Sequence, residues 1–240
     1  MNQPLTMDIS GIKVLAFDAD DTLWDCQGHF EEATDRYCEI LAPFADFETV
    51  RASLFQTETK NMPDLGFGTK AFTLSLVENA VKVSKGKVPA DDVGRILELG
   101  RGLLHLPATP LDGVEETLRY LEKRWKGRMV LFTKGELLDQ ESKLERSGLA
   151  HFFSRTFIVS DKTPDEYRNL CRDCNCQPHE LLMVGNSFKS DIRPVLEIGG
   201  YAVHIPFHVT WELEHAPTFR HERLAELEHI TQLVNLLNGE

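Results

Sequence analysis

The sequence predicts an α/β protein: a doubly wound parallel sheet of five core strands with an inserted α-helical domain. Short apolar runs rich in Val, Ile and Phe recur along the chain, and stretches of helical character separate the last four of them. Such runs suit strands that are covered on both faces, as in a parallel sheet. Alternating strands and helices indicate right-handed βαβ units. One unusually long connection predicts the inserted domain.

The expected elements of the core follow from these runs and from helix boundary residues. Strands are expected at 13–17, 128–132, 156–159, 181–184 and 201–205. Helices are expected at 136–147, 163–173 and 189–198, and a final surface helix at 219–237. The first of these helices is followed by Gly148, which suits the left-handed conformation after a helix. The second begins with Pro164, which suits a first helical turn.

The connection between the first two strands spans about 85 residues, far more than a crossover connection needs. Helices are expected within it at 31–41, 49–59, 70–83 and 90–104, with Pro and Gly breakers at 63–68 and 85–89. A helix at 111–123, with apolar residues at helical spacing, returns the chain to the sheet. We therefore expect a catalytic core formed by 1–24 and 110–240, and a helical cap formed by 25–109.

Composition and charge argue against several classes of protein. The 240-residue chain has a formal net charge of -12, which disfavours binding to the phosphate backbone of nucleic acids. No apolar run approaches ~20 residues, so no membrane span is expected. The N-terminus does not have the pattern of a signal peptide, and five cysteines, an odd number, do not suggest a disulfide framework. We expect a cytoplasmic protein.

Polar side chains gather where the first four strands end. These strands are followed, in order, by Asp18 to Thr22, Thr133 to Gly135, Ser160 to Lys162 and Gly185 to Asp191. Ligands of an open parallel sheet bind beyond the carboxyl ends of its strands. Carboxylates, a hydroxyl, an ammonium and an amide are therefore expected at the same edge of the sheet. Their convergence is stronger evidence for a functional site than any one motif.

The chemistry that fits this set is phosphoryl transfer through an aspartyl-phosphate, because a carboxylate can serve as a covalent nucleophile. Two unit negative charges ~4 Å apart repel by about 4 kcal/mol at an effective dielectric near 20. A divalent cation and a lysine are needed to offset that repulsion, and clustered oxygen ligands suit Mg²⁺. A second acid two residues further on can protonate the leaving oxygen and later activate water. Asp18 and Asp20 have that spacing.

These motifs carry a family resemblance. The segment FDADDT, residues 17–22, matches the DxDxT signature of the haloacid dehalogenase superfamily, in its phosphatase branch. The four motifs occur in that superfamily's order over nearly the whole chain. The chain therefore resembles a phosphatase of this superfamily, and the resemblance implies a Rossmann-like core with an inserted C1-type helical cap.

The resemblance also implies roles for individual residues. Asp18 would be the nucleophile and Asp20 the general acid and base. Thr133 would donate a hydrogen bond to the transferring phosphoryl group, and Lys162 would neutralise the nucleophile and the phosphoryl oxygens. Thr133, Lys134 and Lys162 together are expected to bind the substrate phosphate.

The resemblance further implies a magnesium site. Its ligands would be a carboxylate oxygen of Asp18, the backbone carbonyl of Asp20, and the motif after the fourth strand, through Asn186 and Asp191. The first position of that motif is commonly Asp, whereas here it is Asn186. An amide oxygen can still bind Mg²⁺, but it brings no negative charge. The third motif also departs, because Asp161 precedes the lysine where glycine is common.

Three alternative activities bear on this interpretation. The dehalogenase branch of the superfamily shares the first aspartate, but it lacks an acid at the position of Asp20 and uses no metal. Sugar phosphomutases with the same cap share the whole motif set. A non-catalytic protein that binds metal or phosphate is the third alternative. The expected function is hydrolysis of a phosphate monoester of a small metabolite, with Mg²⁺, and the oligomeric state stays open.

A cysteine cluster and two loops are further candidates for functional sites. Cys171, Cys174 and Cys176, with His179, resemble half of a zinc site, but no second cysteine pair completes it, so free thiols are expected. The segments around Phe67 and around Trp211 are loops that could border the active site. We expect Phe67 to reach over the pocket.

Overall fold

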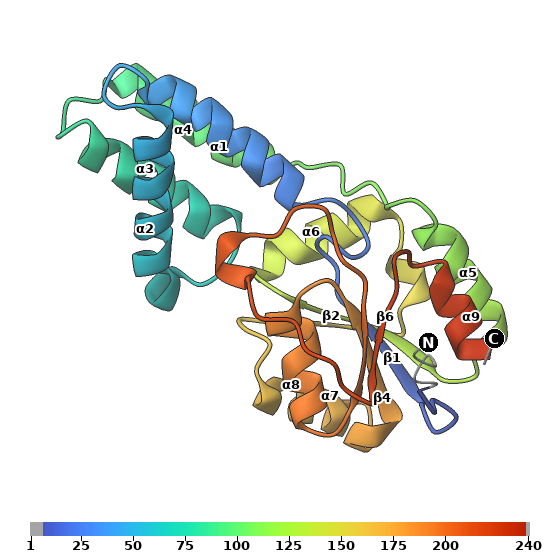
Figure 1. The fold of residues 1–240 in the computed structure, drawn as a ribbon. Coiled ribbons are helices and arrows are strands. Elements are labelled where there is room, and N and C mark those ends of the chain that lie inside the picture. The colour runs from blue at the N-terminus through green and yellow to red at the C-terminus, as the bar shows by residue number, and fades with distance from the viewer. Residues whose placement is uncertain (1–6, 239–240) are drawn as a thin grey trace.

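A computed structural model describes residues 7–238 of the chain, and it is built around a parallel sheet of six strands (Figure 1). The strand order is β3-β2-β1-β4-β5-β6, and every neighbouring pair is parallel. The strands are β1 (Val14–Phe17), β2 (Arg128–Lys134), β3 (Arg155–Val159), β4 (Leu181–Gly185), β5 (Tyr201–His204) and β6 (Leu224–Glu226). The predicted doubly wound α/β fold is confirmed, and so are its five strands.

Helices cover both faces of the sheet. Those of the core are α5 (Val114–Arg124), α6 (Leu137–Ser147), α7 (Pro164–Asp173), α8 (Arg193–Glu197) and α9 (Gln232–Asn238). Alternate residues of β1 pack on opposite faces, as the two-residue period of a strand requires. Leu15 and Phe17 join a cluster that includes residues of α5 and α9, whereas Val14 and Ala16 join one that includes residues of α7 and α8.

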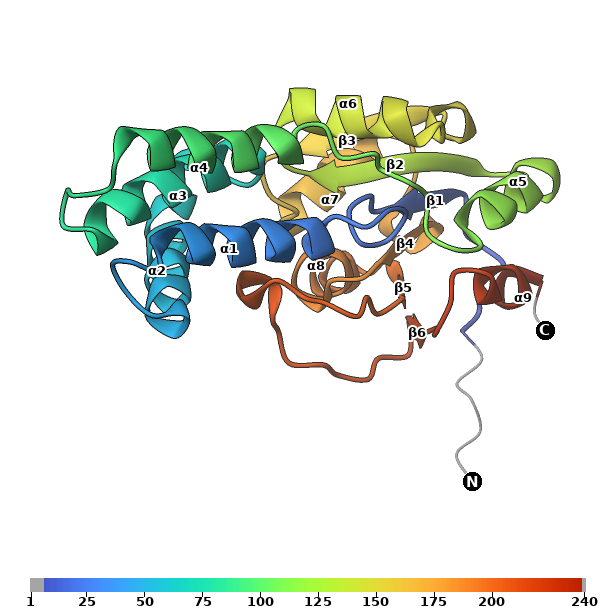
Figure 2. The same cartoon turned by 90° about the horizontal axis from the view of Figure 1, so that it is seen from above.

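Of the five helices between β1 and β2 in the chain, four project from one end of the sheet (Figures 1 and 2). They are α1 (Gln27–Leu41), α2 (Phe47–Leu65), α3 (Thr69–Val83) and α4 (Ala90–Leu103). They share a hydrophobic cluster of their own, in which Tyr37 and Leu76 are fully buried. The chain leaves and re-enters the core at one place, because Trp24 forms an isolated bridge with Pro110.

Two expectations about secondary structure were wrong. Helix α2 continues through Pro63 to Leu65, where a break was expected, because a proline in the last turn removes only one backbone hydrogen bond. The expected helix at 219–237 is instead the short strand β6 followed by α9. Strand β6 pairs with the open edge of β5, so tertiary pairing decides the structure of a segment too short to show a strand pattern.

The described chain has neither a membrane-spanning helix nor a disulfide. Within residues 7–238, no helix is long and apolar enough to cross a membrane. All five cysteines are buried and none forms a disulfide.

Candidate active site

The carboxyl ends of β1, β3 and β4 bring three charged side chains into contact. Asp18 follows β1, and its backbone N–H donates to the carbonyl of Val184 in β4, 2.9 Å away. The ammonium of Lys162, which follows β3, forms ion pairs with Asp18 and with Asp191, the latter at 2.7 Å. All three side chains are buried. The predicted nucleophile, lysine and distal carboxylate therefore form one buried cluster.

Asp191 is held in place by the turn after β4. It lies in a π-helical turn, Phe188–Ile192, and its Oδ2 accepts a hydrogen bond of 2.9 Å from the backbone N–H of Ser187. A Cβ atom at Gly185 would lie 2.3 Å from the same oxygen. Only glycine leaves room for this close approach, so Gly185 has a direct role in placing the Asp191 carboxylate.

Asn186 enters the cluster through a threonine. The hydroxyl of Thr22 lies 3.1 Å from Oδ2 of Asp18 and 3.2 Å from Oδ1 of Asn186. This contact brings the amide oxygen of Asn186 close to the carboxylate of Asp18. Thr22 therefore links the first and fourth motifs.

The burial of this cluster changes its proton equilibria. Burial and the neighbouring Asp191 raise the pKa of Asp18 and Lys162 lowers it, with a net value of about 7. Burial lowers the pKa of Lys162, but Asp18 and Asp191 outweigh that effect and raise it overall. Lys162 therefore remains an ammonium beside the two carboxyl groups.

Asp20 is bound on both of its carboxylate oxygens by hydrogen-bond donors. Lys143 Nζ lies 2.8 Å from Oδ1 and 2.7 Å from Oδ2. Trp24 Nε1 donates to Oδ1 and Gln140 Nε2 donates to Oδ2, each at 2.8 Å. Burial alone would raise the pKa of Asp20, but Lys143 and these hydrogen bonds bring it below its usual value. A protonated carboxyl would have to point its O–H at a donor, so this environment favours the carboxylate.

Two of the donors to Asp20, Gln140 and Lys143, come from a polar buried face of α6. Asp139, Gln140, Lys143 and Ser147 are buried, whereas Leu137 and Leu138 at the start of the helix are 58% and 63% exposed. The helix starts at Glu136, whose side chain accepts a hydrogen bond from the backbone N–H of Asp139. Its polar side faces the site, the reverse of an ordinary surface helix.

A second charged network closes one side of the site. Lys134, at the end of β2, forms an ion pair with Glu214 and donates to Ser190 Oγ at 2.8 Å. Glu214 also accepts from the hydroxyls of Ser187 and Ser190, each at 2.6 Å. Glu214 lies in the segment after β5, so this network fastens that segment to the ends of β2 and β4.

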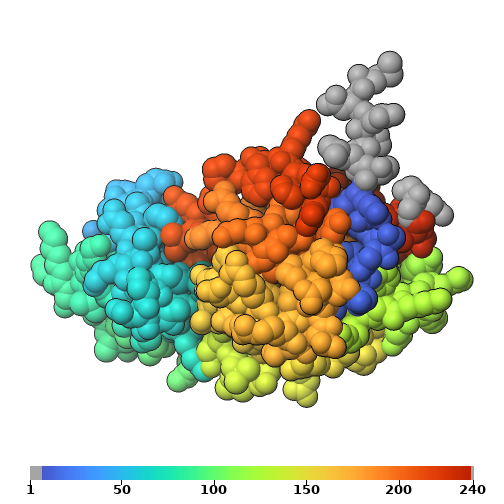
Figure 3. Space-filling model, turned by 90° about the horizontal axis from the view of Figure 1, so that it is seen from below, coloured from blue at the N-terminus to red at the C-terminus, as the bar shows by residue number. Residues whose placement is uncertain are grey.

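The two predicted border loops meet at this network. The Lys134 ammonium lies 4.0 Å from the centroid of the Phe67 ring, and Phe67 packs edge-on against Trp211 with ring centroids 5.9 Å apart. In Figure 3 the segment after β5, in orange to red, lies against the helical insertion, in blue to teal. Phe67 therefore contacts the core from the insertion, and Lys134 lies beneath it.

A cavity of about 640 Å³ lies between the core and the inserted helices. Every residue predicted for the site lines it, namely Asp18, Asp20, Thr133, Lys134, Lys162, Asn186 and Asp191. The first two aspartates belong to one loop, yet their side chains have different partners. Asp18 contacts Lys162, and Asp20 contacts Lys143. A volume of this size suits a small organic molecule.

The oxygen atoms around Asp18 fit the chemistry of Mg²⁺. Within residues 7–238, no group of three His, Cys, Asp or Glu side chains has metal-binding geometry. The predicted set, however, combines two carboxylates, Asp18 and Asp191, with the amide oxygen of Asn186 and the backbone carbonyl of Asp20. Mg²⁺ is usually held by one or two carboxylates together with other oxygens. The types of residue present therefore fit the ion. In this structure Lys162 bridges the carboxylates of Asp18 and Asp191.

Sequence reasoning missed four residues of this site: Trp24, Gln140, Lys143 and Glu214. The polar spacing of Asp139, Gln140, Lys143 and Ser147 in a predicted helix was a usable signal, because it marks one helix face. No such signal in the sequence pointed to Glu214, because it lies outside the main helices and strands and 80 residues from its partner Lys134. His204, in β5, makes a structural contact with the carbonyl of Asn186 at 3.0 Å.

Comparison with known proteins identifies the family. The family model of haloacid dehalogenase-like hydrolases matches residues 12–199, which include β1 to β4 and every predicted site residue. The chain belongs to the haloacid dehalogenase-like hydrolases. The resemblance of the motifs to this superfamily is thereby confirmed.

Individual relatives agree with this assignment. A haloacid dehalogenase-like family hydrolase from Xanthomonas campestris is 31% identical, with a TM-score of 0.84 over 95% of this chain and 91% of that chain. A glyceraldehyde 3-phosphate phosphatase from Methanothermobacter thermautotrophicus is 24% identical over 83% of this chain and 88% of that protein. An L-2-haloacid dehalogenase from Xanthobacter autotrophicus shares the fold, at 16% identity and a TM-score of 0.64 over 95% of this chain and 99% of that chain.

Proposed function

We propose that this haloacid dehalogenase-like hydrolase is a magnesium-dependent phosphatase. Its substrate would be a phosphate monoester of a small metabolite, bound in the cavity between the sheet and the inserted helices. Asp18 would be the nucleophile, and Asp20 the general acid and base. The proposal has one principal support: a lysine bridges two buried carboxylates, and a second acid stands two residues beyond the first of them.

The reaction follows from the chemistry of these side chains. A carboxylate oxygen of Asp18 attacks phosphorus, and the bond between phosphorus and the leaving oxygen breaks. The contacts described above favour the Asp20 carboxylate, so Asp20 must first take up a proton from solvent, which it then gives to the leaving oxygen. It next takes a proton from water, whose oxygen attacks phosphorus; the bond between phosphorus and Asp18 breaks, and the Asp18 carboxylate is restored. Lys162 offsets the negative charge of the phosphoryl oxygens. Thr133, near the end of β2, would donate its hydroxyl to one of them.

The proposed metal would be held by Asp18, the Asp20 carbonyl, Asn186 and Asp191. When bound, Mg²⁺ supplies positive charge that offsets the repulsion between the Asp18 carboxylate and a phosphate dianion. Asn186 contributes no charge, so the ion would depend on the two carboxylates.

Two observations favour phosphate esters over halogenated acids. The phosphatase among the relatives matches most of this chain, whereas the dehalogenase match at 16% identity concerns the fold alone. The superfamily resemblance also associates an acid at the position of Asp20 with phosphoryl chemistry. Asp20 is present here and lines the cavity.

The proposal is tested by phosphate release from para-nitrophenyl phosphate, with and without Mg²⁺, beside the Asp18→Asn variant. We expect release that requires Mg²⁺ and falls at least about 10³-fold in the variant, since removing a nucleophile leaves only binding and electrostatic effects. Release that persists without added metal, in the presence of a chelator, or that survives in Asp18→Asn would contradict the proposal.

A further inference from the structure

The wall of the cavity that faces the catalytic loop is largely apolar. The side chains that form it belong to the inserted helices α1, α2 and α3, and they include Phe30, Phe55, Met62, Leu65 and Phe72. The leaving group of a phosphate ester held by Asp18 and Lys162 would extend toward this wall. The polar groups within it would therefore decide which leaving groups bind.

The charged groups around the cavity are strongly unbalanced. Among the described residues that line it, ten carry a carboxyl group and only four carry a lysine or arginine cation. Each of the four cations already pairs with a carboxylate, in the pairs Arg51–Glu31, Lys134–Glu214, Lys143–Asp20 and Lys162–Asp18. The proposed Mg²⁺ and Lys162 would serve the phosphate. No lining cation is left over for a second anionic group.

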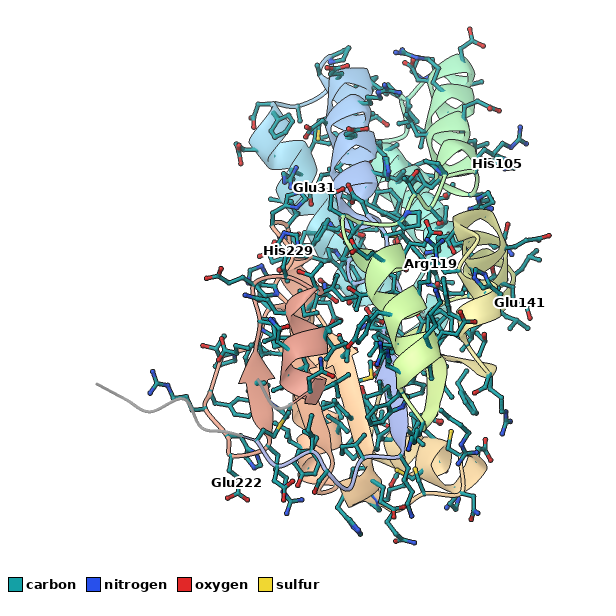
Figure 4. The ribbon with its side chains drawn as sticks, turned by 90° about the vertical axis from the view of Figure 1, so that its right-hand side faces the viewer. Glu31, His105, Arg119, Glu141, Glu222 and His229 are labelled. Carbon is teal, nitrogen blue, oxygen red and sulfur yellow. The ribbon has the colours of Figure 1, made fainter. Side chains whose placement is uncertain are left out.

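Arg51 is the one cation on the inserted helices that lines the cavity, and it is fully engaged. Its guanidinium pairs with Glu31 and lies 3.5 Å from Oδ1 of Asp35. Glu31 belongs to α1 and is labelled in Figure 4. A carboxylate on the leaving group would have to displace Glu31 from this pair and leave that carboxylate without a partner.

Glu58 is the feature that points to a ligand. It lies on α2 and lines the cavity, yet it makes no side-chain hydrogen bond or ion pair with any residue in the described part of the chain. Burial, with a contribution from Glu31, raises the pKa of Glu58 to about 7. The side chain is half-buried, and with no protein partner its carboxyl group is available to a hydrogen-bond donor on the ligand.

We propose that the natural substrate is a phosphate monoester whose leaving group is uncharged or cationic and carries a hydroxyl or amine that binds Glu58. The inference rests on the proposed phosphatase activity. Esters with a carboxylate or a second phosphate on the leaving group are rejected, because the wall would repel them and offers no free cation. Glu58 is then the residue of the insertion that determines specificity.

Two matched pairs of esters test the proposed preference for an uncharged or cationic leaving group. Glycerol 3-phosphate and 3-phosphoglycerate differ by a hydroxymethyl group in place of a carboxylate. Phosphoethanolamine and phosphoglycolate differ by an aminomethyl group in place of a carboxylate. We expect kcat/KM to be about tenfold or more higher for the first member of each pair, given the repulsion between like charges in a partly buried site. The second pair is expected to show the larger ratio.

The Glu58→Gln variant assigns the effect to one residue. It keeps the size of the side chain and removes its charge, so the phosphoethanolamine to phosphoglycolate ratio should fall about tenfold. Glu39→Gln is the matched control, because Glu39 is exposed on α1 and does not line the cavity. It removes the same charge from the insertion and should leave the ratio as it is. Thermal melting of both variants checks that they fold.

The outcomes separate the two levels of the proposal. Metal-dependent release from para-nitrophenyl phosphate, combined with equal or higher kcat/KM for the carboxylate members, overturns the substrate class and leaves the phosphatase activity standing. An unchanged ratio in folded Glu58→Gln removes the role of Glu58. If no ester releases phosphate, the phosphatase proposal fails and the substrate class fails with it.

Discussion

Lys143 holds Asp20 by both carboxylate oxygens, at 2.8 and 2.7 Å, although 123 residues separate them in the chain. Lys143 is buried, on the face of α6 that looks toward the site. This contact fixes the orientation of the proposed acid and base and opposes its protonation. Lys143 would act through Asp20, whose carboxylate it holds, so its proposed role is that of a positioning residue.

The Lys143→Met variant should therefore impair the chemistry more than substrate binding. We expect kcat to fall about 10- to 100-fold with an alkyl phosphate, with a smaller change in KM, because Asp20 loses its fixed orientation. Para-nitrophenyl phosphate should be less affected, since its leaving group needs less help from an acid. Lys143→Arg should recover part of the loss. Equal losses for both esters in Lys143→Met would argue against this role.

The segment after β5 should depend on Glu214. Glu214→Ala removes the partner of Lys134 and two hydroxyl contacts, at a cost of about 1–3 kcal/mol in the free energy of unfolding. Limited proteolysis should then cut residues 206–220 faster than in the wild type. Glu212→Ala, a neighbouring substitution outside this network, is the control. A cleavage rate unchanged by Glu214→Ala would show that the network does not hold the segment.

Phe67 should affect turnover without affecting the fold. Its ring lies between the Lys134 ammonium and Trp211, at the point where the insertion contacts the core. We expect Phe67→Ala to lower kcat/KM about tenfold through weaker closure of the cavity over the substrate. The melting temperature should change little, and Phe67→Tyr should keep most of the activity. A normal kcat/KM in Phe67→Ala would show that Phe67 does not contribute to closure of the cavity.

Glu58 should make stability fall as the pH rises. Burial raises its pKa from the ordinary value of 4.5 to about 7, so the folded state binds more protons than the unfolded state between these values. Wild-type stability should decline across that window relative to Glu58→Gln. Above pH 7 the variant should be more stable by about 2 kcal/mol. Denaturant unfolding at pH 4.5 and pH 8 measures the difference, and a gap that does not depend on pH would contradict it.

The sequence allowed much of the fold to be predicted because local patterns dominate there. The runs that form β1, β2, β4 and β5 are apolar enough to be recognised one by one, and each falls within a residue or two of its observed bounds. Strand β6 escaped because its three residues gain their structure from the edge of β5. Helix α2 extends beyond the expected 49–59 to Leu65, because Pro63 in its last turn does not end it.

The same distinction applies to the site. Asp18 and Asp20 could be predicted because the loop after a buried strand is local to the sequence. Lys143 and Glu214 could not, because their partners lie 123 and 80 residues away. A buried lysine in a helix looks like a surface lysine until the contacts of that helix are known. The roles of all the predicted site residues toward phosphate and metal stay predictions.

The most direct test of the central claim is the detection of a phosphoryl group on Asp18 during turnover. The enzyme would be mixed with Mg²⁺ and a substrate, quenched in acid and analysed by peptide mass spectrometry, beside Asp18→Asn. Our account predicts a phosphorylated peptide that carries Asp18, that disappears as substrate is exhausted, and that is absent from the variant. Steady release of phosphate with no modification of Asp18, together with turnover by Asp18→Asn, would contradict it.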